Sequence, residues 1–275
     1  MDKKRGEGFV SEIALLAGEG LLPVAIAEAL SALGTPPVVI PFGKPDPGLL
    51  SLAESVLPVQ EVSIGNILAP LKARGVKRLV LAGVVPKRWI FGGGRLDRKT
   101  LEWVGSLPAK DDHSLLGAVV ALIESQGVEV VPYRLLIPGN LAPEGLVAGR
   151  EPTQEEMQDV RYGINVAKEV VRLSFGQSLA VLSGSVLAVE AMEGTDEMIA
   201  RAGRIGGKGV VVKMMRSDQD ERFDLPTVGP DTLGRMAEGG LSCLAVEAGR
   251  TVILDRARFA EMASLHGIAV TGFVP

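Results

Sequence analysis

The chain has 275 residues, of which 47% are hydrophobic, and its 29 Lys and Arg against 33 Asp and Glu give a formal net charge of −4. With 1 cysteine and 2 histidines it can build neither a disulfide framework nor a four-ligand Cys/His zinc site, so acid, base and metal chemistry would fall to carboxylates, lysines or tyrosines. An aromatic content of 4% and a pI near 5.4 argue against a protein that binds nucleic acid. Length and apolar content predict a globular protein of two domains.

The first half alternates short apolar runs with helical patterns, which is typical of βαβ units on a parallel sheet. The expected elements, in chain order, are a strand at 13–17, a helix at 22–33, a strand at 38–40, a helix at 64–74, a strand at 78–84, a helix at 114–125 and a strand at 128–131. These expected helices end at glycines, which suit a left-handed C-terminal cap. The pattern predicts an α/β domain over residues 1–136.

Residues 137–152 are rich in proline and glycine, a composition typical of a linker. Thr153 and Glu156 then form a capping box that starts a helix. The elements expected beyond it are a hairpin of strands 179–182 and 186–189, a helix at 196–202, a strand at 210–213, a second hairpin turning at Ala248-Gly249, and a final helix and strand. The sequence therefore predicts a mixed α+β domain over residues 153–275.

No segment has the pattern of a targeting or membrane-spanning element. The apolar stretch near the start is interrupted by Glu12 and Glu19. The longest later stretch, residues 179–192, contains Glu190 and is far shorter than the ~20 residues that span a bilayer. We therefore expect a cytoplasmic protein.

A glycine-rich turn containing Gly18 and Gly20 follows the first expected strand and precedes a helix. Glycines let the backbone approach an anion, and the amides at a helix N-terminus point toward it. Pro23 replaces the third glycine of the dinucleotide fingerprint, and no acidic residue follows the second strand, which argues against NAD. Contact with a phosphate or nucleotide and a plain tight turn both stay open.

Two further motifs have weaker signals. Lysines and arginines cluster at 77–99 with Asp97 opposing them, and the run 88–91 places apolar bulk beside these cations. The cluster is either a solvated face or a loop for an anionic amphiphile or membrane surface. In Asp111-Asp112-His113, we expect Asp112 to cap the following helix and His113 to be structural.

The second half carries a denser group of polar residues. One expected strand leads into Glu190 and the next into Lys213, which is followed by an acidic loop that contains Asp220 and Asp224. Loops that leave strand ends in this way can converge at one edge of a sheet, where carboxylates suit Mg²⁺ or Mn²⁺. Lys213 would offset the charge of a phosphate, and Asp224 or Asp220 would orient or deprotonate a water. An exposed acidic turn is the alternative.

The runs 187–196 and 213–229 closely resemble the UDP-2,3-diacylglucosamine pyrophosphatases of the lipid A pathway, in the form that occurs where the calcineurin-like enzyme is absent. Residues 17–23, the Asp111-Asp112 pair and Gly176-Gln177 give supporting matches. The order and spacing of these motifs fit over essentially the whole chain.

This resemblance implies an N-terminal Rossmann-like domain, a C-terminal catalytic domain, and a substrate held between them. It implies Mg²⁺-dependent hydrolysis of UDP-2,3-diacylglucosamine to 2,3-diacylglucosamine 1-phosphate and UMP, with water attacking the phosphorus on the sugar side. By position, Asp224 is the first candidate for the catalytic carboxylate and Asp220 the second, with Lys213 beside them. The expected metal ligands are Asp220, Asp224 and Glu190, and the expected substrate-binding residues are Gly18, Gly20, Thr195, Asp196, Gln219 and Thr227.

Other interpretations stay open at this point. A non-catalytic regulator that binds a nucleotide sugar or a lipid would use the glycine turn and the basic stretch. An NAD-linked oxidoreductase is a weaker alternative. A homodimer and peripheral contact with the inner membrane surface are also left open.

Overall fold

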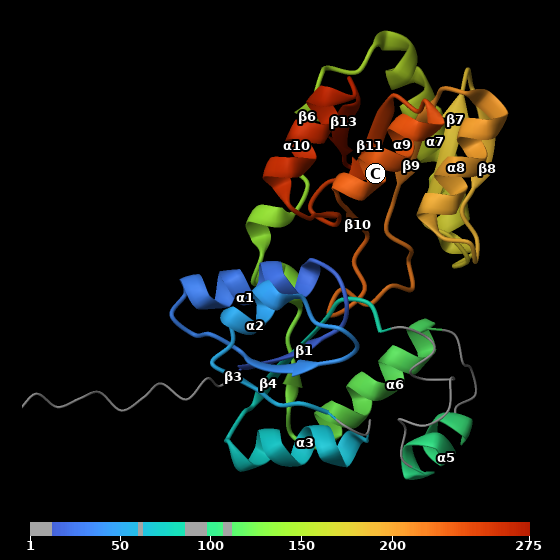
Figure 1. Ribbon diagram of the computed structural model, residues 1–275. Helices are drawn as coiled ribbons and strands as arrows, with labels where there is room; N and C mark the ends of the chain where they lie inside the picture. The colour runs from blue at the N-terminus through green and yellow to red at the C-terminus, as the bar shows by residue number, and fades with distance from the viewer. Residues whose placement is uncertain (1–12, 60–62, 86–97, 107–111) are drawn as a thin grey trace, which may run out of the picture. The chain divides into compact units, whose positions relative to one another are not determined.

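The computed structural model describes residues 13–59, 63–85, 98–106 and 112–275 (Figure 1). The chain divides into two compact units. The N-terminal unit comprises Met1–Ile137 and Asp220–Phe223, and the C-terminal unit comprises Pro138–Gln219 and Asp224–Pro275. Among the described residues, no helix has both the length and the apolar character needed to cross a bilayer.

The N-terminal unit is built on a five-stranded parallel sheet in the order β3-β2-β1-β4-β5. Its strands are β1 (Ile13–Ala17), β2 (Val38–Pro41), β3 (Ser55–Val56), β4 (Arg78–Ala82) and β5 (Glu129–Val130). Its described helices are α1 (Leu22–Ala32), α2 (Pro47–Ser51), α3 (Ile64–Ala73), α5 (Arg98–Ser106), α6 (Asp112–Ser125) and the short η1 (Tyr133–Leu135). This strand order reverses between β1 and β4, as in Rossmann-like folds, so the predicted α/β architecture is confirmed.

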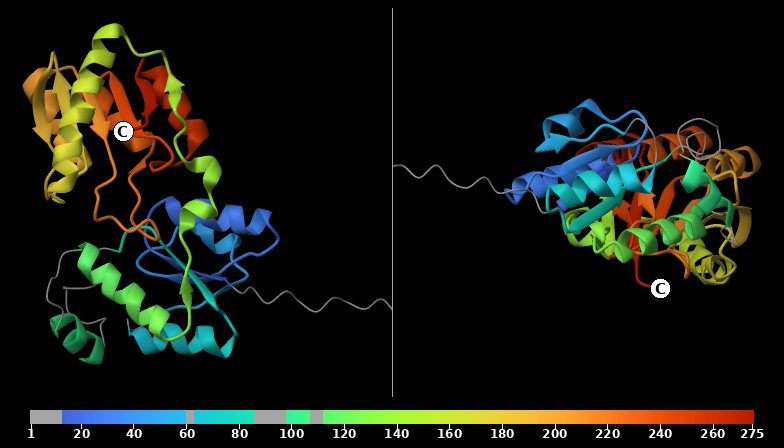
Figure 2. Two further views of the ribbon diagram at one scale, coloured as in Figure 1. Left: turned by 180° about the vertical axis from the view of Figure 1, so that it is seen from behind. Right: turned by 90° about the horizontal axis from the view of Figure 1, so that it is seen from below.

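Helices cover both faces of this sheet, with α1 and α2 on one side and α3 and α6 on the other (Figures 1 and 2). Alternate strand residues point to opposite faces, and both sets are apolar because both faces are covered. Ile40 and Leu79, for example, pack in one core cluster with Leu71 of α3 and Val120 of α6.

The C-terminal unit is built on a six-stranded mixed sheet in the order β6-β13-β11-β9-β7-β8. Its strands are β6 (Gly145–Gly149), β7 (Ser178–Leu182), β8 (Ser185–Val189), β9 (Val210–Lys213), β11 (Cys243–Glu247) and β13 (Ala269–Phe273), and β10 (Thr227–Val228) pairs with β12 (Val252–Ile253) in a separate ladder. Its helices are η2 (Pro138–Asn140), α7 (Gln154–Arg172), α8 (Thr195–Gly206), α9 (Pro230–Gly239) and α10 (Arg256–Leu265). The predicted mixed α+β character is confirmed.

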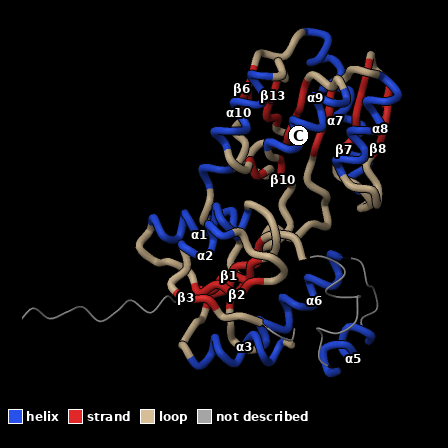
Figure 3. Tube along the Cα trace, in the orientation of Figure 1, coloured by secondary structure: helices blue, strands red, loops and turns tan. Residues whose placement is uncertain are grey.

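Helix α7 covers one face of this sheet, while α8, α9 and α10 cover the other (Figures 2 and 3). The predicted capping box is present at its start, because the Glu156 amide donates to Thr153 Oγ1 at 3.2 Å and the Thr153 amide donates to Glu156 Oε2 at 2.8 Å. Halfway along α7, a Cβ on Gly163 would lie 2.6 Å from Val212 Cγ2. The helix therefore approaches the sheet more closely than any larger residue would allow.

Two expectations for the C-terminal part are wrong. Residues 137–152 are not a linker, because β6 lies within them and pairs antiparallel with β13. An edge strand tolerates glycines and a register shift, so its composition resembled that of a loop. The hairpin expected at Ala248-Gly249 is also absent: β11 lies between β9 and β13, and β12 pairs with β10 instead.

Smaller differences concern the N-terminal part. The short elements α2 and β3 have no counterpart among the predicted elements. Strand β4 ends at Ala82 rather than at residue 84, because Gly83 adopts a φ of +86° and turns the chain. Helix α6 begins at Asp112 itself. Asp111, the side chains of Asp112 and His113, and residues 86–97 of the basic stretch lie outside what the structure describes.

Candidate functional site

The glycine turn of the N-terminal unit lies where β1 ends, at the point where the strand order reverses. Gly18 donates its amide to the carbonyl of Ala82 at 2.8 Å, and a Cβ at this position would lie 2.5 Å from the carbonyl oxygen of Val84. Gly18 is therefore required by the close approach of the chain that follows β4. The plain-turn interpretation explains this glycine.

Gly20 differs, because a Cβ there would meet nothing within 4 Å and its φ is +102°. The adjacent helix α1 begins after Leu21 with no side-chain hydrogen bond at its N-cap. Open α/β sheets bind ligands at such a reversal of strand order, outside the carboxyl ends of the strands. Gly20 and the first turn of α1 thus form the part of this turn that can receive an anion.

The carboxyl ends of β8 and β9 lie at one edge of the C-terminal sheet, as predicted. Both strands pair antiparallel with β7, and Leu179 of β7 lies opposite both Val189 and Val212. Glu190, which follows β8, and Lys213, the last residue of β9, therefore lie on either side of Ser178. The sequence placed these two side chains correctly because strand polarity alone decides the edge.

Lys213 is the centre of this edge. Its side chain is 5% exposed, and Nζ donates to Thr195 Oγ1 at 3.2 Å and to the carbonyl of Thr227 at 3.0 Å. Burial lowers the pKa of Lys213, and the nearby carboxylates of Glu190, Asp196 and Asp224 oppose that effect. The ammonium of Lys213 thus interacts with one carboxylate directly after β8, one in the first turn of α8 and one in the loop after β9, a convergence that the sequence could suggest only from strand ends.

Glu190 and Thr195 complete the surroundings of Lys213. Glu190 is 7% exposed, and its Oε2 makes no hydrogen bond within the part of the chain that is described. Thr195 is the first residue of α8, whose N-cap, Gly194, provides no side-chain hydrogen bond. A buried acceptor without a partner costs about 1–3 kcal/mol, and a helix N-terminus favours an anion. Both features suit a bound polar ligand.

Asp224 lies in the loop that follows β9, and its side chain is 33% exposed. Arg216 Nη2 lies 3.6 Å from Asp224 Oδ2, and Arg216 Nε donates to Asp218 Oδ1 at 3.1 Å. One arginine therefore contacts two aspartates of this loop, Asp218 and Asp224. The exposure leaves Asp224 able to contact a substrate or a water.

The same loop is tied to the sheet at its start. Glu247 at the end of β11 is 4% exposed and accepts the amide of Met215 at 2.9 Å. Gln219 accepts the Arg216 amide at 2.7 Å and donates to Gln177 Oε1 at 3.2 Å. Gln219, expected to bind substrate, is 7% exposed and serves the loop itself in this structure. The backbone carbonyl of Thr227 accepts the hydrogen bond from Lys213 Nζ described above.

Asp220 belongs to a different unit from the other residues of this group. Residues 220–223 belong to the N-terminal unit, and the guanidinium of Arg222 binds both carboxylate oxygens of Asp220 at 2.6–3.0 Å. Among the described residues, no group of three or more His, Cys, Asp or Glu side chains could hold a metal ion. Asp220, Asp224 and Glu190 therefore do not form a metal-binding cage made of protein ligands.

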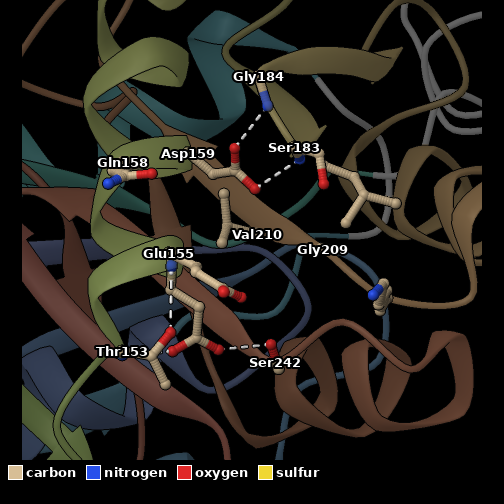
Figure 4. A pocket seen from close by; sticks show the side chains of 12 residues that line it. Thr153, Glu155, Gln158, Asp159, Ser183, Gly184, Gly209, Val210 and Ser242 are labelled. Atoms are coloured by element: carbon tan, nitrogen blue, oxygen red, sulfur yellow. Dashed lines mark hydrogen bonds between the residues drawn. The ribbon is translucent and has the colours of Figure 1, made fainter.

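A cavity of about 550 Å³ lies at the opposite edge of the C-terminal sheet, beside the first residue of β9 (Figure 4). Asp159 and Glu156, two of the carboxylates that line it, are engaged by the protein: Asp159 accepts the amides of Ser183 and Gly184 at 2.8 and 2.7 Å. Burial alone would raise the pKa of Glu156, but hydrogen bonds from Arg150 and Ser242 outweigh it and hold the value at about 2. These groups stabilise the fold, so we assign the cavity no chemical role.

Several residues that shape the candidate site have no sequence motif of their own. Glu247 carried a usable signal, because it is the last residue of a buried strand, as Lys213 is. Arg216 and Arg222 carried none, since a charged residue in an acidic loop is usually solvated.

Known proteins match this chain over almost its full length. The model of the LpxI N-terminal domain matches residues 12–139, and the model of the LpxI C-terminal domain matches residues 143–271. UDP-2,3-diacylglucosamine pyrophosphatase LpxI of Caulobacter vibrioides is 33% identical over 277 residues, which cover 96% of this chain and 98% of that protein. The resemblance found in the sequence motifs is confirmed, and the chain belongs to the LpxI family.

Proposed function

We propose that this protein hydrolyses the pyrophosphate bond of UDP-2,3-diacylglucosamine and releases UMP and 2,3-diacylglucosamine 1-phosphate. Similarity to the Caulobacter pyrophosphatase over nearly the whole of both chains supports the substrate. One structural observation carries the assignment to a site: buried Lys213 lies at the open N-terminus of α8 with the carboxylates of Glu190, Asp196 and Asp224 in electrostatic contact.

Lys213 and the first turn of α8 would bind a phosphate of the substrate. The ammonium is held by Thr195 and by the carbonyl of Thr227, so it needs no reorganisation when negative charge moves onto the departing phosphate. A fixed cation in a site shielded from water stabilises such charge far more than one in bulk solvent. Asp196 lies in the first turn of α8, beside this proposed phosphate position.

Asp224 would orient and deprotonate the attacking water. In the proposed step, the water oxygen bonds to the phosphorus on the sugar side, and the bond from that phosphorus to the bridging oxygen breaks. UMP leaves with the bridging oxygen, and the water proton passes to Asp224. The contact with Arg216 holds the carboxylate while its exposed part faces solvent.

We also propose that hydrolysis requires Mg²⁺ or Mn²⁺. Because the described residues form no protein cage for a metal, the ion would be held mainly by the substrate phosphates, with Asp224 and the unpartnered oxygen of Glu190 as protein donors. Mg²⁺ commonly binds through one or two carboxylates together with substrate phosphates. The ion would neutralise phosphate charge, and Asp220 is not among its proposed ligands.

The two acyl chains of the substrate favour work at a membrane surface, and we propose peripheral contact from the cytoplasmic side. Phe175 and Met192 are 49% and 100% exposed. They lie close to Glu190, because a Cβ on Gly176 would be 2.0 Å from the Glu190 carbonyl oxygen. Exposed apolar side chains therefore border the proposed site.

The test is UMP release from UDP-2,3-diacylglucosamine, with EDTA-treated protein and added Mg²⁺. Asp224→Asn should lower kcat by about 100-fold or more, since general base catalysis contributes that much. Asp231→Asn, an exposed aspartate in the first turn of α9, is the matched control and should keep full activity. In oxygen-18 water, the label should appear in the sugar phosphate.

Undiminished activity of Asp224→Asn would remove Asp224 from the mechanism. Label in UMP would show attack at the other phosphorus. Binding of the substrate without any product in the presence of Mg²⁺ would support a non-catalytic regulator instead.

A further inference from the structure

The segment Asp220–Phe223, which we call the loop anchor, interrupts the C-terminal unit. The chain leaves that unit after Gln219, contributes these four residues to the N-terminal unit, and re-enters the C-terminal unit at Asp224. The proposed catalytic carboxylate is thus the first residue after the anchor. Whatever fixes the anchor also limits where Asp224 can lie.

Arg222 holds the anchor by charged hydrogen bonds. Its Nε and Nη2 bind Asp220 at 2.6–3.0 Å, and its Nη1 binds Glu124 Oε1 at 2.9 Å. Glu124 lies near the end of α6, a helix whose Val120 and Ile123 belong to the core of the N-terminal unit. The hydrogen bonds that Arg222 donates to Asp220 raise the pKa of Arg222 further above its ordinary value, so the guanidinium stays charged.

Two further contacts hold the anchor on either side of Arg222. Arg134 Nε lies 2.8 Å from Glu221 Oε2 in an ion pair. Phe223 packs against the core cluster of the N-terminal unit that includes Val120. Each residue from 220 to 223 is therefore engaged within this unit.

These contacts assign Asp220 a role different from catalysis. A carboxylate that accepts hydrogen bonds from a bidentate arginine has little remaining capacity to activate water, and the pair is geometrically specific. From the place of this segment in the N-terminal unit and from these contacts we infer that Asp220, Arg222 and Glu124 are positioning residues that set the place of Asp224. This inference rests on the catalytic role proposed for Asp224.

The experiment compares Arg222→Met and Arg222→Lys with the wild type in UMP release, and in amide hydrogen exchange of the peptide spanning residues 216–227. Arg235→Met, which removes the exposed pair of Arg235 with Glu238 on α9, is the matched control. The catalytic role of Asp224 is established first with Asp224→Asn in the same assay. A failure there would count against the proposed function and not against the anchor.

Arg222→Met should lower kcat roughly tenfold to a hundredfold with KM nearly unchanged, because a displacement of about 1 Å costs this much. The 216–227 peptide should exchange faster, and Arg222→Lys, which keeps a single-point contact, should recover part of both effects. Glu124→Gln should shift both readouts in the same direction. Arg235→Met should change neither.

Any other combination overturns the inference. A rise in KM at constant kcat would mean that Arg222 contacts the substrate directly. A lower kcat with unchanged exchange would mean that Arg222 acts otherwise than through the loop. Faster exchange with full activity would mean that the anchor does not set Asp224. Thermal unfolding of each variant separates these outcomes from loss of the folded state.

Discussion

The ion pair at the start of α7 allows a quantitative prediction about the stability of the C-terminal unit. Glu156 accepts hydrogen bonds from Arg150 at 2.6 and 2.7 Å, from Ser242 at 2.6 Å, and from the amide of Thr153 at 2.8 Å. Glu156→Gln removes the charge but keeps the shape of the side chain. We expect this substitution to destabilise the C-terminal unit at neutral pH and to have a smaller effect in acid.

The magnitude follows from the pKa of Glu156, which is about 2 in the folded protein against an ordinary value of 4.5. A difference of this size corresponds to about 3 kcal/mol of stability. Arg150 is 38% exposed, so water screens the pair, and we expect about 1–2 kcal/mol. Because the folded pKa is depressed, this stabilisation is complete above pH 4.5 and disappears as the pH falls toward 2.

The assay uses the single cysteine as a probe of the C-terminal unit. Cys243 lies in β11, is fully buried, and has a pKa raised to about 12 by burial, so it reacts only after this unit opens. Both tryptophans, Trp89 and Trp103, fall in the sequence of the N-terminal unit, so fluorescence would follow the wrong part. Urea-dependent labelling with an acid-active pyridyl disulfide gives the free energy of unfolding at each pH.

Glu155→Gln is the matched control, because Glu155 lies in the same first turn of α7 and is exposed. It removes the same charge from the helix N-terminus and should change stability by no more than about 0.5 kcal/mol. An equal loss in both variants would show that the helix dipole, and not the ion pair with Arg150, carries the effect. A Glu156→Gln effect that is constant from neutral pH to about pH 3 would refute the depressed pKa.

Two further predictions concern the candidate site. Lys213→Met should lower kcat for UMP release by about 100-fold while the protein stays folded, because methionine fills the buried space without the charge of lysine. Lys208→Met, at an exposed position, is the control and should leave kcat unchanged. Equal activity of the two variants would contradict the phosphate role of Lys213. Gly176→Ala should destabilise the protein by about 1–3 kcal/mol and reduce activity, because the added Cβ would lie 2.0 Å from the Glu190 carbonyl oxygen. Gly139→Ala is the control, because a Cβ at residue 139 would meet no atom within 4 Å. Equal melting temperatures of the two variants would show that the backbone near Gly176 shifts without cost.

Most of the fold could be predicted from local patterns. The span of β1, the hairpin of β7 and β8, and the capping box at Thr153 were all predicted, because each depends on neighbouring residues. The prediction of a hairpin at Ala248-Gly249 was wrong, because a glycine turn indicates a change of chain direction but not which strand pairs next. Strand order in the C-terminal sheet is set by packing between distant segments, which one sequence does not reveal.

The candidate site, like the fold, could be predicted only in part from the sequence. Glu190 and Lys213 were placed correctly because strand polarity brings them to one edge. Asp220 and Asp224 were grouped because they are four residues apart, yet the structure assigns them to different units. The hydrogen bond from Arg222 to Glu124 joins residues that lie far apart in sequence, so one sequence does not reveal it. Spacing along a loop therefore did not reveal that the two aspartates belong to different units.

The electrostatics of the Lys213 edge favour a substrate that arrives with a divalent cation. A single ammonium interacts with the carboxylates of Glu190, Asp196 and Asp224, so this edge carries an excess of negative charge. A pyrophosphate approaching alone would meet repulsion that Lys213 and a helix N-terminus, worth about 1 kcal/mol or less, do not offset. Neutralising the phosphates with Mg²⁺ removes that repulsion and offers the unpartnered oxygen of Glu190 a positive partner. We therefore propose that these carboxylates, which form no metal cage among the described residues, favour a metal-bound phosphate over a free one.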